Sequence, residues 1–408
     1  MAKRKILVVG DYNVPTGYGY VNESIFDRIY ENFDISVLAC NYDGFKPVFP
    51  ARFPVWACRS TYNLADFVPM IKNIKPDIIY TLNDGYVMPM YVEKLPEIFQ
   101  AEKRPVWVQH VVFDGAPLGP WADSLNHADC LVFPTPWQQR EVAKIYPHLK
   151  SNVIWHGVDK LYFPMKPEDK AKVKVGYYQD PNVFVFGMVG KNFQRKRFPE
   201  LVESFAKFKK MLPEEEGKKV VLAVYTTEAH LTPDSFDILT MATHFGLNKT
   251  NRDVVFIRPT NRAFTHAEMN QLYNSFDVNC LFSYGEGYGL PINHACAVGI
   301  PSLVTDNSVM RDLQADMKCI HLVPPINQRT YWNNDLAHIR YLPDTNKGAE
   351  KMLELYSKLK PGAPPEFRDT QKMFALDFAK RRDWDIVARE WAELFQSIPI
   401  EFPNRGEI

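Results

Sequence analysis

A carboxylate in a glycine-rich turn is the first feature of this sequence that could do chemistry. Residues 283–301 read SYGEGYGLPINHACAVGIP, with an apolar run before them and a helical pattern after Gly289. Glycines let the backbone approach a ligand closely, and the N–H groups at the start of a helix suit a phosphate. Glu286 could accept hydrogen bonds from sugar hydroxyls, or it could simply complement the start of the helix with its charge. The spacing alone leaves both roles open.

A basic cluster follows another predicted strand. Lys191, Arg195, Lys196 and Arg197 come directly after the apolar run 183–189. Cations at the carboxyl end of a strand are what a diphosphate needs, because they supply both charge and hydrogen bonds. A solvated basic turn would have the same composition, so the cluster by itself does not decide between the two.

A second glycine-rich loop lies near the N-terminus. Residues 10–20 read GDYNVPTGYGY, between the first predicted strand and a helical pattern. Backbone amides in such a loop can contact phosphate. Neither glycine-rich loop matches GxGxxG with an acidic residue about 20 positions later, so a dehydrogenase is disfavoured.

Short apolar runs alternate with helical patterns in two series. The first series has predicted strands at 5–10, 35–39, 77–82, 106–112, 130–133 and 153–155, with helices at 22–33, 64–74 and 91–99. The second has predicted strands at 183–189, 220–225, 254–257, 278–282, 302–304 and 320–323, with a helix at 290–298. Such alternation predicts an α/β protein with two doubly wound parallel sheets. Ligands of these sheets bind beyond the carboxyl ends of the strands, so the cleft between the two sheets is the expected site.

The predicted domains are 1–175, 176–380 and a C-terminal helical segment at 381–408. A polar, lysine-rich stretch at 165–174, continuing through 179–181, is interpreted as the link between the first two. Helical patterns at the end of the chain include 383–395. One face of that helix carries Trp384, Val387, Trp391 and Leu394. Such a stripe favours packing on the chain's own domains over a partner or a membrane.

Composition narrows the classes of function. The chain has 408 residues, 46% of them hydrophobic and 24% charged, with a formal net charge of zero. The chain lacks the excess of basic residues that would indicate nucleic-acid binding. It also has no apolar run that approaches the roughly 20 residues needed to span a bilayer. We expect a cytoplasmic protein, with peripheral membrane contact left open. The six cysteines are scattered without metal-ligand spacing, so no metal site is expected.

The segment 283–301 is similar to the donor-site segment of the retaining family-4 glycosyltransferases, whose fold is GT-B. That family's pattern is EGFGLPxxEAMAxGxP, with two glutamates eight positions apart. Glu286 matches the first, whose family role is contact with the donor sugar hydroxyls. His294 stands in place of the second, which holds the nucleotide ribose; a histidine can hydrogen-bond a ribose, or it can be structural. The resemblance also implies donor contacts at Gly287, Tyr288, Gly289 and Leu290.

Two further segments carry the resemblance. Residues 186–205 resemble the family's VGRxxxxKG segment, which binds the donor diphosphate. Lys191 falls at the family's arginine and Lys196 at its lysine, with Arg195 beside them. The resemblance implies that these cations stabilise the leaving diphosphate. The N-terminal loop is similar to the family's glycine loop, which implies donor contacts from Gly17, Tyr18 and Gly19.

Weaker matches follow in the family's order along nearly the whole chain. His110 stands where the family places a histidine near the donor sugar, although a lone histidine is as readily structural. Arg258 and Pro259 lie where the family meets the nucleotide base. Residues 384–394 resemble its terminal helix, which crosses back onto the first domain.

The resemblance implies transfer of a hexose-type sugar, with retention, from a UDP- or GDP-sugar. The first domain would face the acceptor and the second would bind the donor. The leaving phosphate would take the acceptor's proton, without a protein nucleophile, metal or other cofactor. The acceptor, whether glycan, lipid or protein, is not readable from the sequence. Two alternatives stay open: a GT-B epimerase or phosphorylase, and a nucleotide-sugar-binding protein without activity, which His294 in place of glutamate favours.

Overall fold

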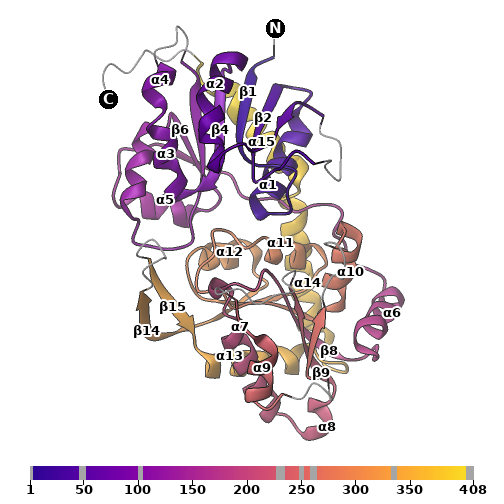
Figure 1. Cartoon of the computed structure of the whole chain (residues 1–408). Helices are drawn as coiled ribbons and strands as arrows, with labels where there is room; N and C mark the ends of the chain where they lie inside the picture. The colour runs from indigo at the N-terminus through magenta and orange to yellow at the C-terminus, as the bar shows by residue number, and fades with distance from the viewer. Residues whose placement is uncertain are drawn as a thin grey trace. The chain divides into compact units, whose positions relative to one another are not determined.

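The structure is a computed structural model. It describes residues 3–45, 52–99, 104–226, 235–247, 252–257, 264–331 and 338–400. Contacts divide the chain into two compact units (Figure 1). Unit 1 comprises Met1–Gly157, Trp332–His338 and Trp384–Ile408, and unit 2 comprises Val158–Tyr331 and Ile339–Asp383.

Unit 1 is built on a parallel sheet with the order β3-β2-β1-β4-β5-β6-β7 among the described residues. Its strands are β1 (Lys5–Asp11), β2 (Asp34–Cys40), β3 (Val55–Trp56), β4 (Ile78–Asp84), β5 (Val106–Val112), β6 (Cys130–Phe133) and β7 (Ser151–Val153). The chain moves outward in one direction from β1 and then in the other from β4. The carboxyl ends of β1 and β4 therefore form a topological switch point, where such sheets bind ligands.

Helices cover both faces of this sheet. They are α1 (Gly17–Ile29), η1 (Thr61–Asn63), α2 (Leu64–Ile74), η2 (Gly85–Val87), α3 (Met88–Val92), α4 (Leu95–Phe99), η3 (Pro120–His127), α5 (Pro136–Ala143) and α15 (Trp384–Ser397). Helices α2 to α4 pack on a core that includes Ile79 and Trp107. The neighbouring Tyr80 points to the opposite face, because side chains alternate along a strand. There its ring contacts Phe26 of α1 and Trp391 of α15.

The C-terminal helix α15 packs within unit 1, as expected for a helix that crosses back. Trp384, Val387 and Trp391 are buried, and Phe395 rather than Leu394 completes the buried face. The guanidinium of Arg4 donates to the carbonyls of Phe395 and Ile398 at 2.7 and 2.6 Å. It thereby satisfies backbone acceptors at the C-terminal end of the helix.

Unit 2 contains a second parallel sheet with the order β10-β9-β8-β11-β12-β13. Its strands are β8 (Phe184–Val189), β9 (Val220–Tyr225), β10 (Val254–Ile257), β11 (Val278–Leu281), β12 (Ser302–Thr305) and β13 (Ile320–Val323), and a hairpin adds β14 (Pro325–Tyr331) and β15 (Ile339–Pro343). Its helices are α6 (Pro167–Tyr178), η4 (Gln194–Lys196), α7 (Phe198–Lys210), α8 (Glu214–Gly217), α9 (Ile238–His244), α10 (His266–Ser275), α11 (Leu290–Ala297), α12 (Met310–Met317), α13 (Thr345–Leu359) and α14 (Pro365–Arg381). The switch point of this sheet lies at the carboxyl ends of β8 and β11.

Most of the predicted link at 165–174 belongs to helix α6. Lys174 of this helix is buried and forms an ion pair of 2.6 Å with Asp277. It also donates to the carbonyl of Val183 at 2.7 Å. A lysine that a carboxylate and a carbonyl satisfy can be buried at little cost, which the polar composition of the segment concealed. The contacts divide the chain earlier, between Gly157 and Val158.

Candidate functional site

The switch point of unit 2 brings together side chains that are far apart in the sequence. Arg195 and Lys196 lie in η4, which follows β8. Glu286 lies in the loop between β11 and α11. Strands β8 and β11 pair directly in the sheet, so the two loops leave it side by side. The position is where a doubly wound sheet binds its ligand.

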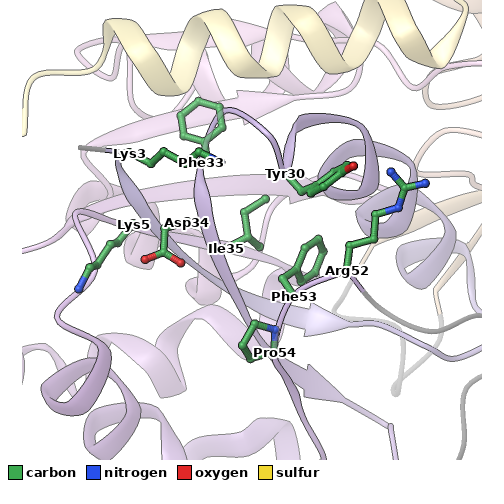
Figure 2. Close-up of a pocket in the computed structure, with 9 residues that line it drawn as sticks. All are labelled: Lys3, Lys5, Tyr30, Phe33, Asp34, Ile35, Arg52, Phe53 and Pro54. Atoms are coloured by element: carbon green, nitrogen blue, oxygen red, sulfur yellow. The ribbon is translucent and has the colours of Figure 1, made fainter. Parts of the chain in front are cut away.

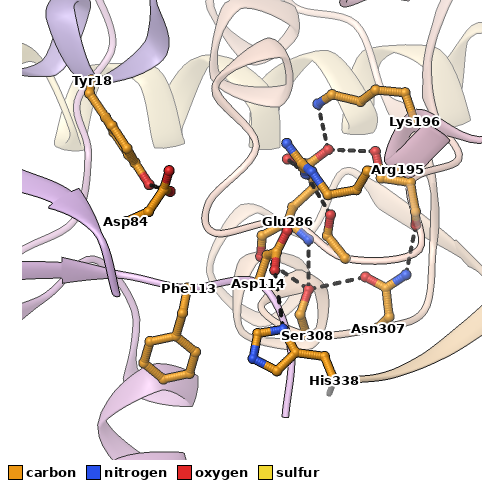
Figure 3. A network of polar contacts seen from close by, with 12 residues as sticks. Tyr18, Asp84, Phe113, Asp114, Arg195, Lys196, Glu286, Asn307, Ser308 and His338 are labelled. Carbon is orange, nitrogen blue, oxygen red and sulfur yellow. Dashed lines mark hydrogen bonds and ion pairs between the residues drawn. The ribbon is translucent and has the colours of Figure 1, made fainter. Parts of the chain in front are cut away.

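Glu286 forms ion pairs with both cations (Figure 3). Its Oε2 is 2.7 Å from Nη1 of Arg195, and its Oε1 is 2.6 Å from Nζ of Lys196. The hydroxyl of Ser283 donates to the same Oε1. Glu286 is only 4% exposed. These side chains form what is called here the Glu286 cluster: Ser283, Glu286, Arg195 and Lys196.

Backbone contacts fix the two loops to each other. The N–H of Tyr284 donates to the carbonyl of Arg195 at 3.1 Å, and Arg195 donates back to the carbonyl of Gly285 at 2.6 Å. The guanidinium of Arg340, from β15, lies 4.9 Å from the ring centre of Tyr284 and is buried. The hairpin of unit 2 therefore supports the loop that carries Glu286.

A third loop, after β12, holds the backbone of Glu286. The N–H of Glu286 donates to Oγ of Ser308 at 3.1 Å, and Nδ2 of Asn307 donates to the carbonyl of Ser283 at 2.7 Å. Ser308 has a positive φ of 38°. Sequence reasoning missed both residues. The available signal was a polar turn at the carboxyl end of a predicted strand next to β11.

Charge balance keeps Glu286 ionised. Burial works against its charged form, but Arg195 and then Lys196 outweigh it and lower the pKa of Glu286 to about 2. Two cations thus share one carboxylate, which leaves the cluster with an excess of positive charge. A carboxylate can accept about four hydrogen bonds, so Glu286 has capacity for a further donor.

The N-terminus of α11 begins next to the Glu286 cluster. Its N-cap is Gly289, which has a φ of 101° that favours glycine. Leu290 and Pro291 start the helix, so the N–H of Leu290 belongs to a first turn without internal acceptors. Gly287 is half-buried, whereas the side chain of Tyr288 is in the core. The arrangement offers backbone donors and a favourable helix dipole to an anion.

The predicted cations take different positions. Lys196 and Arg195 contact Glu286, whereas Lys191 is exposed at the start of the loop after β8. The cations beside the Glu286 carboxylate are therefore Arg195 and Lys196, not Lys191. Of these two, Arg195 has the planar guanidinium that can bind an anion through two hydrogen bonds.

His294 lies on α11 and stacks on Tyr162. The ring centres are 4.1 Å apart and the planes differ by 12°. The ring of Tyr273 meets the ring of His294 edge to face, with the ring centres 5.4 Å apart. Burial, followed by the nearby His266, lowers the pKa of His294 to about 3. The imidazole is therefore neutral at physiological pH and can exchange hydrogen bonds but not charge.

His110 lies in the core of unit 1. It is inside β5, two residues before the end of the strand, and is 0% exposed. Its Nδ1 is 2.7 Å from the hydroxyl of Tyr80, and its Nε2 is 3.3 Å from Nε2 of His156. Trp391 packs against its ring. This environment is that of a structural histidine, and the predicted catalytic role finds no support in it.

The buried histidines of unit 1 should make it sensitive to acid. Burial lowers the pKa of both His110 and His156. The unfolded chain, with histidine pKa near 6.5, therefore binds more protons below that pH, and stability falls as the pH falls. We expect His110→Gln to reduce the loss of unfolding free energy between pH 7 and pH 5 by about 1–2 kcal/mol.

Tryptophan fluorescence during urea unfolding measures this effect in unit 1. The described residues of unit 2 contain no tryptophan, whereas unit 1 contains seven among its described residues. His148→Gln is the control, because His148 is exposed and contacts Asn126. An unchanged pH dependence in His110→Gln would contradict the prediction.

The N-terminal loop residues lie in unit 1, where α1 begins at Gly17. Thr16 is the N-cap and accepts from the N–H of Gly19 at 3.0 Å. A methyl group on Gly19 would lie 2.5 Å from the carbonyl of Val14, so glycine is required there. The hydroxyl of Tyr18 donates to Asp84 at 2.7 Å.

Arg258 and Pro259 lie outside the described residues. Among the residues that are described, no group of three or more histidines, cysteines, aspartates or glutamates could hold a metal ion. In the same part of the chain, no helix is long and apolar enough to cross a membrane.

A pocket of about 530 Å³ lies elsewhere in unit 1 (Figure 2). Lys5 and Asp34, the first residues of β1 and β2, line it together with Tyr30 and Arg52. The pocket therefore lies at the amino ends of the strands, whereas the switch point lies at their carboxyl ends.

Solved structures of glycosyltransferases resemble the whole chain. Sucrose-phosphate synthase from Thermosynechococcus elongatus matches with a TM-score of 0.73 at 15% identity, over 97% of this chain and 98% of that one. The chain has the GT-B fold. A glycosyltransferase from Rickettsia africae matches this GT-B chain with a TM-score of 0.69 at 14% identity, over 97% of this chain and 98% of that one. HepE from Anabaena in complex with UDP-glucose matches with a TM-score of 0.67 at 18% identity, over 97% and 100% of the two chains.

Sequence comparison adds no family to this result. No protein-family model matches the chain, and no curated protein matches it.

Proposed function

We propose that this protein is a glycosyltransferase that takes its sugar from a nucleotide-diphosphate sugar. The observation that carries the proposal is the Glu286 cluster at the switch point of unit 2. Arg195 and Lys196 are held there by one buried carboxylate, beside the first turn of α11. The two cations and the first-turn N–H of Leu290 suit a diphosphate.

Each member of the cluster has a role in this proposal. When the bond between the sugar and the diphosphate breaks, negative charge grows on the leaving phosphate. Arg195 and Lys196 stabilise that charge, and their fixed positions remove the need for reorganisation. Glu286 orients both cations and uses its remaining acceptor capacity for a hydroxyl of the donor sugar.

We further propose a UDP-sugar as the donor, a hexose as the transferred group and retention at the anomeric carbon. Support for UDP comes from the similarity to HepE, which was solved with UDP-glucose. Support for retention comes from the resemblance to family 4 around Glu286. The neutral His294 would hydrogen-bond the ribose in place of a carboxylate. No metal or other cofactor is part of this proposal.

A panel of donors tests the proposal. Purified protein is incubated with UDP-, GDP- and ADP-sugars, and free nucleotide is measured with and without saccharide acceptors. We expect UDP release from one UDP-hexose, and we expect the product's anomeric proton to show the configuration of the donor by NMR. Thermal shifts with the free nucleotides are measured in parallel.

Each other outcome would point elsewhere. Isomerised donor would indicate an epimerase, and cleavage that depends on inorganic phosphate would indicate a phosphorylase. A thermal shift with UDP but no release would indicate a binding protein. No release and no thermal shift with any nucleotide would show that the Glu286 cluster does not bind a nucleotide sugar.

A further inference from the structure

The switch point of unit 1 carries a group of side chains that the proposed function does not yet use. Strand order reverses between β1 and β4, and Asp84 is the last residue of β4. Tyr18 stands in the first turn of α1, which follows β1. Figure 3 shows the ring of Tyr18 extending to Asp84, and its hydroxyl donates to Oδ1 at 2.7 Å.

Two more tyrosines stand beside this pair. The hydroxyls of Tyr62 and Tyr86 are hydrogen-bonded at 2.9 Å, and their rings meet edge to face with centres 6.3 Å apart. Tyr86 is 39% exposed, Tyr18 and Tyr62 are half-buried, and Asp84 is exposed. These four residues are called here the tyrosine cluster.

The backbone that presents Tyr62 is strained. Tyr62 has a φ of 52°, in the left-handed region that bulky residues rarely adopt, and the φ of the next residue, Asn63, is 57°. Three hydrogen bonds hold them there. The buried side chain of Asn63 donates to the carbonyl of Ala39 and accepts from the N–H of Arg59, and the hydroxyl of Tyr91 donates to the carbonyl of Tyr62. Strain that the surroundings maintain is typical of functional positions.

The backbone between Asp84 and Tyr86 is also fixed. A methyl group on Gly85 would lie 2.7 Å from the ring of Trp121. Trp121 is buried, so the chain is packed against the core at this point. Burial, the hydrogen bond with Tyr62 and the charge of Asp84 raise the pKa of Tyr86. Its phenol therefore stays protonated.

We propose that the tyrosine cluster binds the acceptor, and that the acceptor is a carbohydrate. A pyranose has apolar C–H faces and an edge of hydroxyls. The cluster offers aromatic faces for the first. For the second it offers phenol and carboxylate oxygens, which accept hydrogen bonds. A lipid chain would need a continuous apolar surface, whereas here each ring has a hydroxyl engaged with a neighbouring polar group. This inference rests on the proposed transfer reaction.

A saccharide array tests this inference separately from the transfer reaction. Labelled full-length protein is applied with UDP to an array of immobilised mono- and oligosaccharides, and UDP binding is measured on the same samples by thermal shift. We expect the wild type to bind one class of saccharide. Tyr86→Ala and Asp84→Asn should each weaken this binding by about 10-fold or more, because each removes a stacking face or a hydrogen bond. Asp84 is exposed, so Asp84→Asn should fold normally.

The control pair is Tyr146 and Asp123, which are also hydrogen-bonded in unit 1 but lie outside the cluster. Tyr146→Phe and Asp123→Asn should leave saccharide binding unchanged. UDP binding without saccharide binding would overturn the inference and leave the proposed function standing. Binding that Tyr86→Ala and Asp84→Asn do not change, or binding only to phospholipid vesicles or to arrayed peptides, would also overturn it. A missing thermal shift with UDP would count against the proposed function instead.

Discussion

Lys196→Ala is expected to lower kcat/KM for nucleotide release by about 100- to 1000-fold. The amine of Lys196 is held 2.6 Å from Glu286 at the carboxyl end of β8. A fixed cation there stabilises charge on the leaving diphosphate, and removal of one such group costs roughly this factor. Steady-state release of UDP from the donor that the panel identifies measures the effect. Because the charge develops during bond cleavage, most of the loss should be in kcat rather than in KM.

Lys209→Ala is the matched control for this variant. Lys209 forms an ion pair with Asp253 in the same unit, and its side chain is 15% exposed, compared with 12% for Lys196. We expect a similar loss of stability and normal release. Lys196→Arg should recover part of the activity, since charge is kept while geometry changes. Equal rates in Lys196→Ala and the wild type would remove Lys196 from the reaction.

The parallel strands could be predicted closely because they are buried on both faces. Such strands read as short, continuous apolar runs, and β5, β9 and β10 begin and end where the runs do. The hairpin of β14 and β15 was not predicted. Its sequences, PINQRTY and IRYLP, mix polar and apolar residues without a continuous apolar run. Helix α6 was not predicted, because the polar composition of its segment gave no sign that Lys174 is buried and paired with Asp277.

The candidate site could also be predicted only in part. The turn with Glu286 and the cations near Lys196 follow recognisable local patterns. The contact between them depends on the pairing of β8 with β11, which joins residues about ninety positions apart. The support from Ser308 depends on a third strand, and the polar turn after that strand does not by itself show which loop it contacts.

His110 was predicted as a site residue only through its resemblance to the family's histidine. The strand around it begins and ends as predicted, and the histidine is buried inside it. Its partners Tyr80 and His156 come from other segments of unit 1. A lone histidine in an apolar run is therefore better interpreted as a core residue until its exposure is known.

Glu286→Gln is expected to lower turnover by about 100-fold while UDP binding stays as strong or becomes stronger. The amide keeps the size of the side chain but removes the charge that orients Arg195 and Lys196, and small misplacements of such groups have effects of this size. At the same time, both cations become available to a free diphosphate. A variant that loses UDP affinity would contradict the proposed role of Glu286. Isothermal titration with UDP and steady-state release separate the two effects.

The same change should destabilise unit 2, since loss of one partner from a buried ion pair typically costs about 3–5 kcal/mol. The pH dependence identifies the cause. The pKa of Glu286 is about 2 in the folded state, below the usual 4.5. Ionised Glu286 therefore stabilises the fold by about 3 kcal/mol above pH 4.5, and this contribution disappears as the pH falls towards 2. Hydrogen exchange of peptides from residues 278–298 should therefore differ most between wild type and variant above pH 4.5, and the difference should shrink in acid. Asp277→Asn is the control, because Asp277 is a half-buried carboxylate that is paired with Lys174 outside the Glu286 cluster. It should lose stability and keep its affinity for UDP, whereas a weakened affinity there would show that instability alone accounts for effects at Glu286.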